Sequence, residues 1–200
     1  MRYLIMCEGP NEKEIINILL EKGCLGNKAF GHITEDELLG LTVYHARQIK
    51  KSGIVQMELN MCADEVAVFR IGDKQSDKLD IPKEYRSKIK IVEKYCTKPE
   101  LEILLIIAEG LMADYNKVKT TVKPKDYAKA HIKFGKHKYD NSSAFYREYF
   151  GERPQLLIES IKEYKKCNGS HNKDEKYLAD LLYYGCLLYT SDAADDTPCV

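Results

Sequence analysis

Carboxylates follow two apolar stretches of this chain, at the point where each stretch ends. Glu8 and Glu12 come directly after the run at residues 2–7, and Asp73 comes after the run at 66–72. In parallel strands of one sheet, such residues face the crevice where α/β proteins bind ligands. Acids that converge there repel one another, and a hard divalent cation such as Mg²⁺ or Mn²⁺ holds them ionised. We therefore expect a metal site in which Glu8, Glu12 and Asp73 are the catalytic residues.

Two more acids are candidate ligands of the same cation, together with Glu8 and Asp73. Asp77 follows Asp73 closely and could reach back across its loop. Glu102 lies in a segment that is apolar nearly all round, and a buried carboxylate must find a partner or a metal. Plainer readings stay open, because aspartates are common in turns and glutamates stabilise the first turn of a helix.

A lysine-rich segment between residues 117 and 138 is the fourth feature. It holds eight lysines against the single acid Asp126, with Tyr127 and Phe134 interleaved. Clustered lysines and aromatics attract the phosphate backbone of a nucleic acid. Because the segment lacks arginine, we expect contacts that do not depend on the base sequence. A solvated lysine face is the alternative. The candidate nucleic-acid-binding residues are Lys117, Lys119, Lys123, Lys125, Lys129, Lys133, Lys136 and Lys138.

The elements that must position these residues follow from hydrophobic patterning. The region from 43 to 63 is ambiguous, and Gly53 divides it into a helical piece and a second weakly periodic piece. Asn11 with Glu14 and Thr97 with Glu100 have the spacing of capping boxes. We predict strands at 2–7, 66–72 and 88–95, and helices at 11–22, 98–112, 124–133, 142–150, 153–167 and 174–184.

This order of elements predicts an α/β fold with a mainly parallel sheet wrapped by helices. We expect a core at residues 1–113 and a helical, lysine-rich extension at 114–185 packed on it. No apolar run is long enough for a membrane span, and the start of the chain does not read as a signal peptide, so we expect a cytoplasmic protein. The cysteines are scattered and lack CxxC spacing, which argues against a zinc site or a disulfide framework.

Residues 186–200 break with the composition of the rest of the chain. They read like a translated sequencing adapter, since a transposase mosaic-end sequence gives CLLYTS in one frame and the attached primer then gives DAAD. We leave this non-native tail out of the fold prediction and expect the natural sequence to stop near Gly185. Without the tail, 31 basic residues stand against 28 acidic ones.

Three motifs together resemble the Toprim-like (Rossmannoid) proteins of the RloB and OLD-nuclease kind. These are the EG-x-x-E turn at 8–12, the acidic strand end at Asp73 and the K-P-E-L-E segment at 98–102. The resemblance covers residues 1–167 patchily. It implies that Glu8 and Glu12 are the family's principal and second glutamates, Asp73 the first aspartate of its D-x-D, and Glu102 the glutamate of its NPxFE-type segment. The chain departs from the family at Gln75, where a strict D-x-D has Asp.

The resemblance also implies a function. It suggests a magnesium-dependent nuclease, a hydrolase of nucleic-acid phosphodiesters, with a part in antiviral defence and abortive infection. Gln75 leaves an alternative open, a catalytically inactive Toprim-like module. Such a module would bind nucleic acid or a partner protein and have a regulatory role. The sequence contains no P-loop, so an ATPase of such a defence system would be a separate protein.

Overall fold

The structure is a computed structural model that describes residues 1–73, 78–98, 100–167 and 175–183. Its centre is a five-stranded sheet in the order β4-β1-β5-β6-β9, in which every neighbouring pair runs parallel. The predicted α/β fold with a mainly parallel sheet is therefore confirmed, and the arrangement is compatible with a Rossmann-like fold. The strands are β1 (Arg2–Cys7), β4 (Tyr44–His45), β5 (Val66–Gly72), β6 (Ile89–Cys96) and β9 (Lys176–Tyr177).

The two faces of the sheet bury different side chains, because successive residues of a strand point to opposite sides. Ile5 and Phe69 belong to a large apolar core that includes residues of α1, α3, α6 and α7, whereas Leu4 and Val68 pack in a smaller core with α2. With both faces covered, the strands form continuous apolar runs instead of alternating ones. The helices are α1 (Pro10–Glu21), α2 (Gly53–Met61), α3 (Ile103–Ala108), α6 (Ser143–Phe150) and α7 (Pro154–Cys167).

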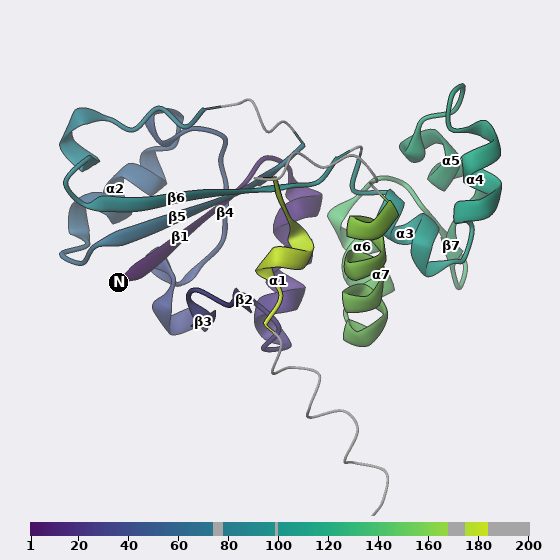
Figure 1. The fold of residues 1–200 in the computed structure, drawn as a ribbon, viewed down its shortest axis with the longest axis horizontal. Coiled ribbons are helices and arrows are strands. Elements are labelled where there is room, and N and C mark those ends of the chain that lie inside the picture. The colour runs from purple at the N-terminus through teal and green to yellow at the C-terminus, as the bar shows by residue number, and fades with distance from the viewer. Residues whose placement is uncertain (74–77, 99, 168–174, 184–200) are drawn as a thin grey trace, which may run out of the picture.

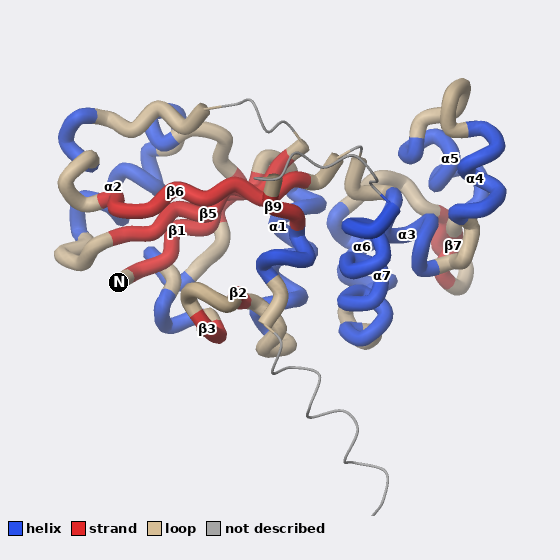
Figure 2. Tube along the Cα trace, viewed as in Figure 1, coloured by secondary structure: helices blue, strands red, loops and turns tan. Residues whose placement is uncertain are grey.

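Much of the chain after β6 lies beyond the carboxyl ends of the strands. In Figure 1 the sheet starts at the marked N-terminus, and α3, α6 and α7 stand at the opposite end. Figure 2 shows a further group of short helices outside them, next to β7. The lysine-rich segment belongs to this outlying group, which consists of α4 (Met112–Val118), α5 (Pro124–His131) and the hairpin of β7 (Lys133–Phe134) and β8 (His137–Lys138).

The prediction of a helix at 174–184 is wrong. The described part of that segment forms β9, which pairs with Tyr95 and Cys96 of β6, and then the 3₁₀ turn Leu178–Leu181. Pairing satisfies backbone groups that an open strand end would leave without partners, and this outweighs the helical pattern. The chain after residue 113 is therefore not purely helical, because it supplies one strand of the sheet.

The helical piece expected before Gly53 is also wrong. That stretch forms the edge strand β4, which pairs with Met6 and Cys7 of β1, and a short 3₁₀ turn at Ile49–Lys51. The second piece, after Gly53, is the helix α2. Sheet pairing again decides the conformation, because a two-residue strand is too short to show a period of its own.

Neither predicted capping box forms. The N-cap of α1 is Gly9, ahead of Pro10, and Glu14 pairs with Arg147 of α6 instead. The helix α3 is shorter than the predicted 98–112 and begins only at Ile103, so Thr97 is not at its start. The residues of the two predicted capping boxes have other roles in the structure. Glu14 makes a tertiary contact, and Asn11, Thr97 and Glu100 line a cavity.

Some predictions lie outside the described residues. These concern Asp77, Gln75 and the tail at 186–200. Within the described ranges, no helix combines the length and the apolar character that crossing a lipid bilayer requires. No disulfide joins the cysteines of this part of the chain.

Candidate active site

The carboxyl ends of β1 and β5 open into a cavity of about 320 Å³. The two strands pair in register along their whole length, which brings Glu8 and Asp73 to the same edge. Glu12 reaches the cavity from the first turn of α1, and Glu102 from the residue before α3. The structure thus gathers four of the five predicted acidic site residues around one space.

Glu8 and Asp73 contact each other directly. Their side chains are within hydrogen-bonding reach, and burial together with this neighbouring carboxyl raises the pKa of Glu8 above its usual value. A guanidinium nitrogen of Arg47 lies 3.2 Å from Glu8 Oε1 and opposes the rise. Gly72 makes the packing feasible, because a Cβ there would come within 2.5 Å of Glu8 Oε2. Two carboxyl groups in contact need a shared proton or a cation between them.

The edge strand β4 supplies two further groups beside Glu8. His45 Nε2 lies 3.1 Å from the Glu8 carbonyl oxygen and so contacts the turn that follows β1. Arg47 comes two residues later, and 70% of its side chain is exposed. An exposed guanidinium can change partners at little cost, so Arg47 is free to follow the charge of whatever occupies the cavity.

Glu12 is half-buried and lies over Gly9. Burial raises the pKa of Glu12, and the negative charges of Glu8, Glu102 and Asp73 raise it further. The hydrogen bond from the backbone amide of Glu12 itself lowers it, but the net shift is upward. The acids around the cavity therefore act on one another as a set. A carboxyl with a raised pKa can take up a proton closer to neutral pH, which suits a general base.

Glu102 is the most enclosed of these acids, with only 6% of its surface exposed. The Tyr139 hydroxyl donates to Glu102 Oε1 at 2.8 Å. With its amide nitrogen turned towards the acid, Asn141 donates to the same oxygen at 3.1 Å, and its Oδ1 accepts from Lys125 Nζ at 2.9 Å. The need for a partner that made Glu102 a candidate metal ligand is met by these donors.

Lys125 is the member of the lysine-rich segment that lines the cavity. Its backbone amide donates to Glu100 Oε2 at 3.1 Å, which ties the first turn of α5 to the segment before α3. The cavity therefore has a cation on its wall as well as carboxylates. The other seven lysines are exposed on or beside α4, α5 and the hairpin, and they do not line the cavity: Lys117, Lys119, Lys123, Lys129, Lys133, Lys136 and Lys138.

The acids do not form a ready-made metal cage. Within the described residues, no three His, Cys, Asp or Glu side chains lie close enough together to hold a metal ion. Glu8, Asp73 and Glu102 do not form such a group, and the cation site expected from the sequence stays a prediction. Mg²⁺ in proteins commonly keeps several waters and takes only one or two carboxylates, so the contact between Glu8 and Asp73 has the donor chemistry for a hydrated ion.

Two residues that line the cavity each carry a buried polar atom without a partner among the described residues. Thr97 Oγ1 and Asn11 Oδ1 belong to residues that line it, and neither has a hydrogen-bond partner in the described part of the chain. Only 1% of Thr97 is exposed. Buried polar atoms are almost always paired, so these two are the least satisfied polar groups of the residues around the cavity.

No protein-family model, no curated protein and no solved structure matches this chain. The likeness to Toprim-like proteins therefore rests on the short motifs around Glu8, Asp73 and Glu102 alone. Function has to be inferred from the chemistry of the cavity.

Several cavity residues carried no functional signal in the sequence. Arg47 follows a strand of only two residues, and Thr97 and Asn11 resemble helix caps. Asn141 precedes two serines and looks like part of a turn; it adopts a left-handed φ of 67°, which asparagine tolerates better than most residues. None of these residues stands at a sequence spacing from other reactive residues that would mark a functional motif.

Proposed function

We propose that this chain is a Toprim-like, divalent-metal-dependent nuclease that hydrolyses phosphodiester bonds of nucleic acid, with Mg²⁺ or Mn²⁺ at Glu8 and Asp73. The observation that carries the proposal is the contact between these two carboxyl groups at the ends of neighbouring parallel strands, beside a cavity of about 320 Å³. A water molecule takes roughly 30 Å³, so this space admits a hydrated ion and a phosphate group. A cation held by Glu8 and Asp73 would supply positive charge to the phosphate as its negative charge develops.

The residues of the chain have distinct tasks in this reaction. A water oxygen bonds to phosphorus while one P–O ester bond breaks, and the departing oxygen gains a proton from solvent. Glu12 takes the proton of the attacking water, because its raised pKa makes it a better base than an ordinary glutamate. Lys125, on the cavity wall, binds the non-bridging phosphate oxygens through its ammonium group.

The exposed lysines serve binding rather than chemistry. These lysines come before and after Lys125 along the chain, and they lie on or beside the outlying helices and hairpin. A single strand of nucleic acid could run across this surface from one lysine to the next. Ion pairs with the phosphate backbone release counterions, so affinity for nucleic acid falls steeply as salt rises. The absence of arginine from this segment favours binding without sequence preference.

A second proposal is a domain that binds nucleic acid or a partner protein without cutting, as a regulatory component of phage defence. The lack of a three-residue metal group among the described residues favours it. So does Arg47, whose guanidinium already supplies a positive charge to Glu8. In this proposal any ATPase of the system is a separate protein.

Cleavage assays with Glu8→Gln test both proposals. The wild type should cut at least one of single-stranded DNA, double-stranded DNA and RNA in Mg²⁺ or Mn²⁺. Glu8→Gln should lose cutting at least about 100-fold, the scale on which a removed catalytic group acts. Glu159→Gln is the matched control, because Glu159 is an exposed glutamate of α7 remote from the cavity. Undiminished cutting by Glu8→Gln excludes the nuclease mechanism, and binding of nucleic acid without cutting or metal uptake supports the second proposal.

A further inference from the structure

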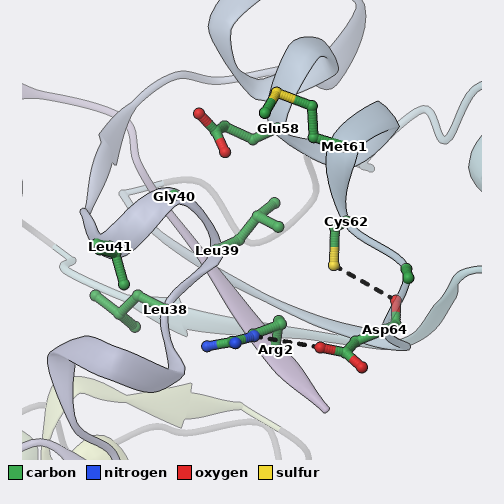
Figure 3. A pocket seen from close by; sticks show the side chains of 10 residues that line it. Arg2, Leu38, Leu39, Gly40, Leu41, Glu58, Met61, Cys62 and Asp64 are labelled. Carbon is green, nitrogen blue, oxygen red and sulfur yellow. Dashed lines mark hydrogen bonds and ion pairs between the residues drawn. The ribbon is translucent and has the colours of Figure 1, made fainter.

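A second cavity, of about 310 Å³, lies where the strands of the sheet begin, at the edge away from the acids. It is bounded by the carboxyl-terminal part of α2, the 3₁₀ turn at Leu39–Leu41 and the start of β1. None of the site residues predicted from the sequence lines it. Figure 3 shows it from close by, with Leu38, Leu41, Glu58, Met61, Arg2 and Asp64 among the labelled side chains.

Large apolar side chains are exposed around this cavity. Ile54, Met57 and Met61 follow one another at helical spacing along the outer face of α2, and they are 63%, 52% and 75% exposed. Leu41, on the facing turn, is 57% exposed. Leu41 and Met61 line the cavity itself, and Ile54 and Met57 continue the exposed row along α2. Neighbouring exposed apolar side chains mark an interaction site, and methionine adapts its shape to a partner.

Two acids, Glu58 and Asp64, line this cavity. Glu58 projects from the same helix, and none of the ion pairs in the described part of the chain involves it. Asp64 pairs with Arg2 at 3.3 Å, and the Arg2 guanidinium also donates to the backbone carbonyl of Asp36. The turn Glu35–Glu37, which precedes Leu38 in the chain, contains three more acids, and Lys88 donates to the carbonyls of Leu59 and Cys62 at the end of α2. Of the two acids that line the cavity, Glu58 is the one outside the ion pairs of the described residues.

We propose that this α2 surface, made of Leu41, Ile54, Met57, Glu58 and Met61, binds a short amphipathic helix of a basic partner protein. Apolar side chains of that helix would pack on the methionines, and a lysine or arginine of it would pair with Glu58. The exposed stripe from Ile54 to Met61 is about 10 Å long at a rise of 1.5 Å per residue, which suits two to three turns of a partner helix. The inference is independent of the proposed nuclease, because the two cavities lie at opposite ends of the strands.

A pair of labelled peptides tests the inference by fluorescence anisotropy. One is an amphipathic helix of leucine and lysine, about 14 residues long, and the other has glutamate in place of every lysine. The leucine–lysine peptide should bind the full chain at least about tenfold more tightly than the leucine–glutamate peptide. The double variant Met57→Ser with Met61→Ser should weaken its binding at least about tenfold, and Glu58→Gln about threefold.

Two controls separate this surface from other sites. Val92→Ser removes an exposed apolar side chain outside the surface, and Glu8→Gln alters the acidic cavity; both should leave peptide binding unchanged. Circular dichroism checks that each variant is folded. Equal binding of the two peptides, or binding that survives the double methionine substitution, would overturn the inference. So would sedimentation showing that the chain dimerises through Met57 and Met61, since the occupant would then be a second copy.

Discussion

The guanidinium of Arg47 lies 3.2 Å from the Glu8 carboxylate, beside the place where the proposed cation binds. This ion pair joins the loop after the edge strand β4 to the end of β1. It supplies positive charge to Glu8 while Asp73 opposes ionisation of the same group. A divalent ion that arrives there meets a like charge as its neighbour, so Arg47 and the metal compete for Glu8.

Arg47→Ala should therefore tighten Mn²⁺ binding at pH 8, where the acids are ionised. We expect about a threefold gain, because the guanidinium is exposed and its repulsion is screened by solvent. Electron paramagnetic resonance of free Mn²⁺ measures the affinity. Arg86→Ala, at an exposed arginine that does not line the cavity, should leave it unchanged. Weaker Mn²⁺ binding by Arg47→Ala would show that the guanidinium supports the metal site instead of competing for it.

Glu12→Gln should raise the melting temperature at neutral pH. Burial and the neighbouring acids raise the pKa of Glu12 in the folded chain above its unfolded value of about 4.3. Below that pH both states are protonated and the substitution has no effect through ionisation. As the pH rises, the unfolded chain releases its proton first, so the native state loses stability until the folded pKa is passed. Calorimetry should thus show a gain that grows above about pH 4 and levels off once the folded pKa is passed.

Glu21→Gln is the matched control of opposite sign. A hydrogen bond from Arg147 lowers the pKa of Glu21, so ionised Glu21 stabilises the fold above its unfolded pKa. Its removal should lower the melting temperature slightly or leave it unchanged at neutral pH. Should Glu12→Gln melt no higher than the wild type at any pH, the acids of the cavity would not share a repulsive field.

Tyr139→Phe should lower the free energy of unfolding by about 1.5–3 kcal/mol, because it removes a donor from the buried carboxylate of Glu102. Tyr44→Phe is a matched change at another buried tyrosine, whose hydroxyl donates to the neutral carbonyl of Leu39 at 3.1 Å. The loss there should be nearer 1 kcal/mol. Urea denaturation measures both values, and equal losses would argue against a stronger hydrogen bond at Glu102.

Gly72→Ala should weaken metal binding by about tenfold, or roughly 1.4 kcal/mol, because the added Cβ would come within 2.5 Å of Glu8 Oε2 and displace that carboxylate. Gly53→Ala adds the same methyl group at the start of α2, where no atom lies within 4 Å of the new Cβ. Titration calorimetry with Mn²⁺ compares the two variants. Unchanged affinity in Gly72→Ala would place the metal away from Glu8.

The strands that carry the acids could be predicted because both faces of the sheet are buried. Continuous apolar runs mark β1 and β5 with their observed bounds, and the helix α7 was predicted at 153–167 and observed at Pro154–Cys167. The strands β4 and β9 could not be predicted, since each has two residues and exists only by pairing with a neighbour. The same limit applies to the 3₁₀ turns and to the short hairpin of the lysine-rich segment.

Local pattern specifies that Glu8 and Asp73 leave buried strands at their carboxyl ends, and that lysines cluster later in the chain. It does not specify that Arg47 pairs with Glu8 or that Tyr139 and Asn141 enclose Glu102. Those contacts join residues that are tens of positions apart, and no periodicity of 2 or 3.6 residues extends across such a separation. Pairing of β4 with β1 decides the Arg47 contact, and packing of the chain beyond the strand ends decides those of Glu102, because each buried polar group must find its partner in whatever part of the chain is brought next to it.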